Sequence, residues 1–295
     1  MIPRCLAVLS LLLAAGCLPH QVDRAGPDLS AAPSGAEQKW GIPFAKDGVA
    51  NGQILEATFY LPQTAYLPEI TGRPLPLVIL SHGSPRGQAR PTILYREQAK
   101  WFTDRGFAVV VPMRRGYGRS HGSWSEGYGA CGNADYTRAG LATADDILAT
   151  LAYFRDQSLI DPDRILLVGQ SAGGFGSVAA ASRKPAGVRG VINFAGGRGS
   201  QSSGSNCSPD ALVAAMESYG RTTDLPSLWI YTRTDRYFGP ALSGRMYQAF
   251  DRASPSSSDY RLLDTTPGDG HSLFTRDIPA WSPVVQDWLT RQGLP

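Results

Sequence analysis

The chain has 295 residues, a formal net charge of +3, 42% hydrophobic residues and 18% charged residues. These values are typical of a globular protein, and the length is sufficient for one large domain with a sizeable core. Because the charge is close to zero and no dense block of lysine and arginine occurs, the sequence gives no reason to expect a nucleic-acid partner.

The N-terminus has the pattern of an export signal. Arg4 precedes an apolar run over residues 5–15, and a glycine and a cysteine follow. A run of about 11 apolar residues is too short for a bilayer, which needs about 20. We therefore predict a signal peptide over residues 1–16, with a buried N-terminal helix as the alternative.

The stretch "LAAGC" at residues 13–17 resembles the bacterial lipobox, although Ala14 stands where that motif most often has leucine. The resemblance implies that Cys17 becomes the lipidated first residue and anchors the protein to a membrane. Leu18 implies the outer membrane, facing the periplasm or the exterior, and simple secretion or a periplasmic location is the alternative. Residues 17–39 are rich in Ala, Pro, Ser, Gly and charge, which predicts a flexible tether before a single domain over residues 40–295.

Apolar runs and helical patterns alternate through this domain. Strands are expected at residues 53–61, 75–83, 107–113, 164–169, 188–196, 226–233 and 259–264, and helices at residues 92–106, 139–157, 172–183, 208–220, 239–253 and 279–292, the last of them beginning at or just after Pro283. Most of the strand patterns lack period-2 alternation. They therefore predict a mainly parallel sheet with helices on both faces, whose loops at the carboxyl ends of the strands bind ligands.

The stretch "GQSAG" at residues 169–173 falls between a predicted strand and a predicted helix. In this context Ser171 is a candidate nucleophile on a sharp turn, at a helix N-terminus that favours developing negative charge. A glycine-rich turn without chemistry is the alternative.

A serine nucleophile requires a base, and His271 is the only histidine downstream of Ser171. It lies in a loop between the last strand and the last helix, where the base of such a site belongs. Asp235, which follows the strand at 226–233, is the expected acid; Asp269, Asp251 and Asp264 are its rivals.

The oxyanion hole is expected from the backbone N–H groups of Ala172 and Ser84. Ser84 follows "HG" after the strand at 75–83, where glycine allows close approach of the backbone to a ligand. We expect His82 to brace this loop rather than to take part in the chemistry.

The four cysteines are compatible with export. Cys5 would leave with the signal peptide and Cys17 would carry lipid, so Cys131 and Cys207 remain. An even pair in an oxidising compartment predicts a disulfide, and two unpaired thiols are the alternative.

From "LSHG", "RRGYGRS", "GQSAGG", "YTRTD" and "GHSLF", the chain resembles the α/β-hydrolase superfamily, and most closely its dienelactone hydrolase-like and prolyl-oligopeptidase-like branch. The resemblance implies a three-layer α/β-hydrolase fold and a Ser-Asp-His triad that needs no cofactor or metal. Dienelactone hydrolases often have a cysteine nucleophile where this chain has Ser171, so lactone specificity is not implied. The related peptidases usually carry a propeller or cap domain, for which this length leaves no room.

The loop at 114–136 starts at a strand end near Ser171 and is expected to line the substrate pocket through Arg114, Arg115 and Tyr117, with an arginine that binds a substrate carboxylate. A surface loop tied down by Cys131 and Cys207 is the alternative. The expected activity is hydrolysis of a small carboxylic ester through an acyl-enzyme. A small peptidase or amidase with the same triad, and a non-catalytic envelope lipoprotein, are the alternatives.

Overall fold

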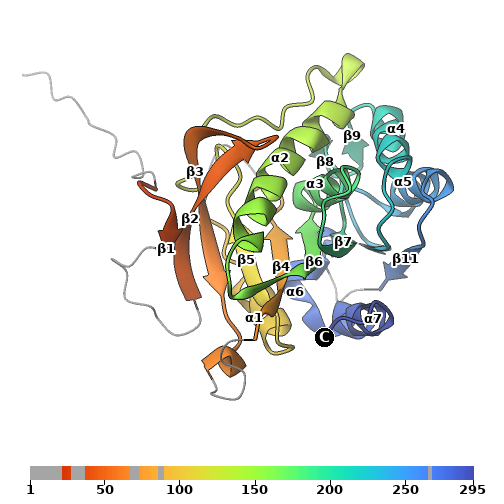
Figure 1. Ribbon diagram of the computed structural model, residues 1–295. Helices are drawn as coiled ribbons and strands as arrows, with labels where there is room; N and C mark the ends of the chain where they lie inside the picture. Colours follow the sequence, from red (N-terminus) through yellow and green to blue (C-terminus); the bar gives the residue numbers. More distant parts are fainter. Residues whose placement is uncertain (1–21, 28–36, 67–72, 86–89, 265–267) are drawn as a thin grey trace, which may run out of the picture.

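The computed structural model describes residues 22–27, 37–66, 73–85, 90–264 and 268–295 (Figure 1). Nine strands form one sheet in the order β1-β2-β3-β5-β4-β6-β7-β10-β11. Six of these strands are mutually parallel: β4 (Leu75–Ser81), β5 (Ala108–Pro112), β6 (Ile160–Gln170), β7 (Val188–Phe194), β10 (Ser227–Thr232) and β11 (Ser258–Leu263). The mainly parallel sheet predicted from the sequence is confirmed.

Helices cover both faces of the sheet, and each face has its own apolar core. One core is formed under α2 (Tyr136–Arg155), α3 (Ala172–Ala181), α4 (Pro209–Gly220) and α5 (Pro240–Ala253). The other lies under α1 (Arg96–Thr103), α6 (Leu273–Arg276) and α7 (Ile278–Arg291). Neighbouring residues of β4 alternate between the two cores, because successive side chains of a strand point to opposite faces. This explains why the strand sequences are apolar throughout.

The sheet includes residues before residue 40, in the segment for which the sequence predicts a flexible tether. β2 (Glu37–Lys46) pairs antiparallel with β3 (Val49–Tyr60), and its Trp40, Ile42 and Phe44 pack into the first core. The short strand β1 (Gly26–Pro27) in turn pairs with β2. Part of the predicted tether is therefore an edge of the sheet, whereas the predicted signal peptide and Cys17 lie outside the described residues.

Helix α7 begins at Ile278, five residues before the predicted start at Pro283. The Asp277 side chain accepts a hydrogen bond from Ala280 N, and Pro279 occupies the first turn, where proline is favourable. Pro283 removes one hydrogen bond of the helix, but buried residues on both sides of it, Trp281 and Val285, hold the helix against the sheet.

Three short 3-10 helices, η1 (Gln63–Tyr66), η2 (Cys131–Asn133) and η3 (Gly270–Ser272), and the small hairpin of β8 (Ser200–Ser202) and β9 (Ser205–Asn206) complete the described elements. No helix in the described parts of the chain is both long enough and apolar enough to cross a membrane.

Candidate active site

Ser171 occupies the sharp turn between β6 and α3, near the middle of the sheet. Its backbone has φ 53° and ψ −120°, a conformation that non-glycine residues rarely adopt. The turn closes so tightly that a Cβ on Gly169 would lie 2.3 Å from Gly173 O, and one on Gly173 would lie 2.1 Å from Ser81 O. The two glycines of the motif are therefore required for the strained turn that presents the serine.

His271 belongs to the 3-10 helix η3, in the loop between β11 and α6. Its backbone oxygen accepts a hydrogen bond from Gln170 Nε2 at 3.2 Å, which places the histidine beside the Ser171 turn. Its ring packs against Tyr237, with 4.7 Å between the ring centroids. The imidazole side chain keeps 15% of its surface exposed.

Asp235 contacts the other side of this imidazole. Its Oδ2 lies 3.1 Å from His271 Nδ1, and its Oδ1 accepts hydrogen bonds from the N–H groups of Tyr237 at 2.7 Å and Phe238 at 2.9 Å. The carboxylate is fully buried. This arrangement can fix the imidazole with Nδ1 protonated and stabilise the imidazolium ion that forms when the ring takes a proton.

The three rival carboxylates have other contacts. Asp269 Oδ1 accepts from the backbone N–H of His271 at 3.1 Å and caps η3, so it holds the loop rather than the ring. Asp264 pairs with Arg233, and Asp251 accepts a hydrogen bond from the hydroxyl of Ser258. Asp235 therefore makes the direct contact with the ring of His271, at 3.1 Å from Nδ1.

The loop after β4 lies directly against the Ser171 turn: a Cβ on Gly83 would be 3.2 Å from Ser171 Cβ. Ala172 is the first residue of α3, and the N–H groups of a first helical turn have no partner within the helix. The loop after β4 also brings Ser84 to this side. The two predicted oxyanion donors thus come from segments that meet at Ser171.

The His82 ring holds this loop in place through its contacts with Gly83 and Arg114, as the sequence predicts. Its ring is fully buried, with Nδ1 2.7 Å from Gly83 O and Nε2 accepting from Arg114 N at 3.4 Å. Burial, assisted by the charge of Arg114, lowers the pKa of His82 to about 3. The ring is therefore neutral, and its Nδ1–H donates to the Gly83 carbonyl.

The predicted roles of Arg114 and Arg115 in binding a substrate carboxylate are wrong. Arg114 is fully buried, forms an ion pair with the equally buried Glu126 and donates to His82 O at 2.6 Å. Arg115 donates to Asp146 Oδ1 at 2.9 Å and stacks on Phe44. Both guanidinium groups already have carboxylate partners inside the protein, so neither is an unpaired cation for a substrate carboxylate.

Tyr117, the third residue predicted for the pocket, lies next to the loop after β4. Its hydroxyl is 3.2 Å from Ser84 Oγ. Ser84 belongs to the loop after β4 (residues 82–85), which is named the oxyanion loop for its predicted role. The ring is 3% exposed and also lies next to Glu126.

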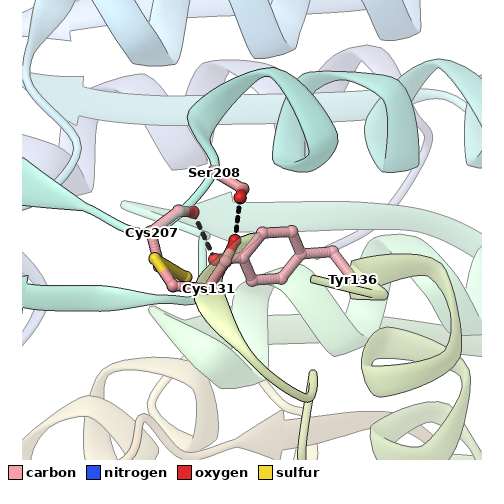
Figure 2. Close-up of a disulfide and its surroundings, with 4 residues drawn as sticks. All are labelled: Cys131, Tyr136, Cys207 and Ser208. Atoms are coloured by element: carbon pink, nitrogen blue, oxygen red, sulfur yellow. Dashed lines mark hydrogen bonds between the residues drawn. A yellow bond between two sulfur atoms is a disulfide. The ribbon is translucent and has the colours of Figure 1, made fainter. Parts of the chain in front are cut away.

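Cys131 and Cys207 form the predicted disulfide, which joins the loop after β5 to the segment after β7 (Figure 2). Two further bonds surround it: the hydroxyl of Tyr136 donates to Cys207 O, and that of Ser208 donates to Cys131 O. Arg198, in the same segment after β7, donates to Glu126 Oε2 at 2.6 Å. A covalent bond and a buried ion pair therefore hold the same two segments together.

The sequence does not predict the contacts that four residues make in this region: Tyr95, Gln170, Glu126 and Arg198. Gln170 stands inside the serine motif, and its position next to Ser171 was the available signal. The others are single polar residues, and their contacts exist only once the chain is folded.

A cavity of about 420 Å³ lies elsewhere, at the β1–β2–β3 edge of the sheet. Its lining includes Arg24, Trp40, Glu56 and Arg119, and none of Ser171, Asp235 and His271.

Residues 94–196 match the model of the prolyl oligopeptidase family. The probable dipeptidyl-peptidase 5 of Emericella nidulans is 34% identical over 102 residues, which make up 34% of this chain and 13% of that protein. Only a short part of this relative is therefore matched.

Two solved structures extend the similarity to most of the chain. A puromycin-hydrolyzing peptidase of Mycobacterium tuberculosis aligns with a TM-score of 0.60 and 17% identity, over 88% of this chain and 40% of the peptidase. Acetyl xylan esterase 1 of Thermoanaerobacterium sp. JW/SL YS485 aligns with a TM-score of 0.58 and 16% identity, over 90% of this chain and 87% of the esterase. At these identities the alignments establish a shared fold.

Proposed function

We propose that this chain is a serine hydrolase that cleaves carboxylic esters, because it has the α/β-hydrolase fold and a segment that matches the prolyl oligopeptidase family. The observation that carries the proposal is the contact of the buried Asp235 with the ring of His271, beside the strained turn that presents Ser171. A buried acid, a partly exposed base and a serine at a helix N-terminus are the parts that acyl transfer requires.

In the proposed reaction His271 takes the proton of Ser171, and Ser171 Oγ forms a bond to the ester carbonyl carbon. The N–H groups of Ala172 and Ser84 hold the oxyanion, and such donors contribute about 3 kcal/mol each in the transition state. The bond from carbon to the alkoxy oxygen then breaks, and His271 gives its proton to the leaving alcohol. Water, activated by the same histidine, hydrolyses the acyl-enzyme and regenerates Ser171. We propose that the Tyr117 side chain, next to Ser84, forms part of the acyl or alcohol pocket.

Amide hydrolysis by the same triad is the second candidate, because the matched family and the Mycobacterium protein are peptidases. Ester cleavage is favoured by the more complete correspondence with an esterase: the chain covers 87% of the acetyl xylan esterase but 40% of the peptidase.

The first experiment is intact-mass analysis after treatment with a fluorophosphonate probe, on the wild type and on Ser171→Ala. We expect one adduct on the wild type and none on the variant. Absence of an adduct on folded wild type would contradict the proposal and favour a non-catalytic binding protein. A pair of chromogenic substrates with one acyl group, a p-nitrophenyl ester and the corresponding p-nitroanilide, then separates the two candidates. Faster turnover of the anilide would favour the amidase.

We also propose that the protein is exported and lipid-anchored through Cys17. The disulfide supports export, since such bonds persist in oxidising compartments. The test is metabolic labelling with a palmitate analogue in a bacterial host. Label on the wild type but not on Cys17→Ala supports the anchor, whereas soluble, unlabelled wild type in the periplasm or medium indicates simple secretion.

A further inference from the structure

A chain of three hydrogen bonds connects the three loops of the proposed active site. The backbone N–H of Gly83, on the oxyanion loop, donates to Tyr95 Oη at 3.3 Å. Tyr95 Oη donates to Gln170 Oε1 at 2.7 Å, and Gln170 Nε2 donates to His271 O at 3.2 Å. Gln170 immediately precedes Ser171, so these hydrogen bonds join three segments: the oxyanion loop, the turn that carries Ser171 (the nucleophile turn) and the loop that carries His271 (the base loop).

The groups at the two ends of this series of hydrogen bonds determine which atom donates in each bond. Gly83 N–H can only donate, so the Tyr95 oxygen must accept from it and direct its own proton to Gln170. Gln170 then presents its oxygen to Tyr95 and its NH₂ group to the carbonyl of His271, which can only accept. Burial raises the pKa of Tyr95 to about 12, so the hydroxyl keeps this proton. Each bond therefore supports the orientation of the next.

The backbone at Tyr95 is an independent sign that this side chain is held in place. Tyr95 precedes α1 with φ 49° and ψ 40°, a left-handed conformation that is unfavourable for a residue with a Cβ. The ring packs edge-on against Phe274, with 5.3 Å between centroids. The surrounding structure enforces a strained backbone, as happens at positions with a functional constraint.

The bond to Tyr95 is one of three that hold the two peptides before Ser84. The peptide between His82 and Gly83 is held at both ends, because its oxygen accepts from Arg114 and its N–H donates to Tyr95. The oxygen of the next peptide, between Gly83 and Ser84, is held by His82. In a trans peptide the N–H of Ser84 points away from that oxygen, so it is directed away from the His82 ring.

We propose that Tyr95 and Gln170 are positioning residues that set the oxyanion loop and the base loop in register with Ser171. This inference rests on the proposed serine hydrolase function. Since both residues act through other groups, loosening them should impair the transition state more than substrate binding.

The test compares Tyr95→Phe, Gln170→Met and the double variant with Tyr60→Phe as the matched control. Tyr60 also donates one hydrogen bond, to Leu94 O at 2.8 Å next to Tyr95, and this bond is not part of the series that joins the three loops. The readouts are the rate of fluorophosphonate labelling at Ser171, kcat and KM on a p-nitrophenyl ester, and the melting temperature. Direct removal of an oxyanion donor costs about 10²- to 10³-fold in kcat, so removal of its support should cost about tenfold.

We expect Tyr95→Phe to lower kcat and the labelling rate about tenfold, and Gln170→Met about 30-fold, with KM within about twofold of wild type. The kcat and labelling rate of the double variant should be within about twofold of those of Gln170→Met, because both residues belong to one series of hydrogen bonds. Tyr60→Phe should match Tyr95→Phe in melting temperature and the wild type in kcat.

Equal kcat for Tyr95→Phe and Tyr60→Phe, or multiplicative effects in the double variant, would overturn the inference while leaving the proposed function intact. A loss confined to melting temperature would also overturn it. Absence of labelling on folded wild type would be a different failure, because it removes the serine hydrolase function itself.

Discussion

Two buried ionic groups lie beside the Ser171 turn, and they differ in how each is enclosed. In the first, Glu126 and Arg114 are both fully buried, and Arg198 donates to the same carboxylate. In the second, Asp235 is fully buried but the side chain of its partner His271 keeps 15% of its surface exposed.

The charge of Glu126 is held permanently. Burial alone would raise the pKa of this carboxyl, but the charges of Arg114 and Arg198 outweigh it and keep the pKa below its ordinary value. Because both partners are buried, Arg114, Glu126 and Arg198 form a structural clamp between the loop after β5 and the segment after β7. In the second group only the acid is buried, so His271 is left accessible for proton exchange with a substrate.

The largest effect is expected at the open pair. Asp235→Asn should lower kcat by about 10⁴-fold, because the amide favours the wrong imidazole tautomer and cannot stabilise the imidazolium. The melting temperature should change little, since the oxygen of the introduced amide can still accept from Tyr237 N and Phe238 N. Steady-state ester hydrolysis and a thermal melt measure both quantities. Asp269→Asn, in the same region, is the control; a greater kcat loss there would make Asp269 the acid.

The disulfide that joins the two segments of the clamp comes next. Replacing Cys131 and Cys207 by alanine removes a crosslink between residues 76 apart, which should lower the free energy of unfolding by about 4 kcal/mol. Urea unfolding of the double variant and of the oxidised wild type measures the difference. Equal midpoints, with unchanged activity, would show that the crosslink does not stabilise these segments.

Glu126→Gln should lower the free energy of unfolding by about 3 kcal/mol, because it leaves two buried guanidinium groups without a countercharge. The matched control is Glu217→Gln, which removes an exposed ion pair with Arg221 and should cost less than about 1 kcal/mol. Urea unfolding serves for both. Similar losses of unfolding free energy in the two variants would show that the buried position of Glu126 adds nothing to the effect of its charge.

A smaller, pH-dependent effect is expected from His82, whose pKa of about 3 lies below the ordinary value of 6.5. Between these pH values the unfolded chain binds a proton that the folded protein does not, so stability falls as the pH falls. Relative to His82→Asn, the wild type should lose about 1.4 kcal/mol per pH unit between pH 6 and pH 4.

Asp146, whose pKa burial raises to about 6, has the opposite slope, but it is present in both proteins and cancels in the comparison. Parallel plots of unfolding free energy against pH for the wild type and His82→Asn would contradict a neutral, buried His82.

Much of this architecture could be predicted from the sequence because it depends on local patterns. Apolar runs and helical periodicity located the parallel strands and their helices, and the chain order of Ser171, Asp235 and His271 located the candidate triad. The strand β2, second from one edge of the sheet, is not predicted, although its Trp40, Ile42 and Phe44 alternate as a strand should, because the polar composition before residue 40 is typical of a tether.

The errors at Arg114 and Arg115 have a different origin. A charged residue in a loop is expected to face solvent or ligand, and only the folded chain shows that Glu126 and Asp146 meet these two arginines inside the protein. The contacts of Tyr95 and Gln170 were equally out of reach, since they join residues 75 and 101 positions apart.

The coupling of the two segments by Cys131–Cys207 and by Arg198–Glu126 has a consequence for protein engineering. Loops on a rigid scaffold commonly carry binding residues and vary more than the elements that they connect. Here the loop after β5 and the segment after β7 form one module, and Arg114 ties that module to the backbone of the oxyanion loop. A graft that replaces one of them alone would leave an unmatched thiol and an unmatched buried charge. Libraries for altered specificity should therefore transplant both segments together.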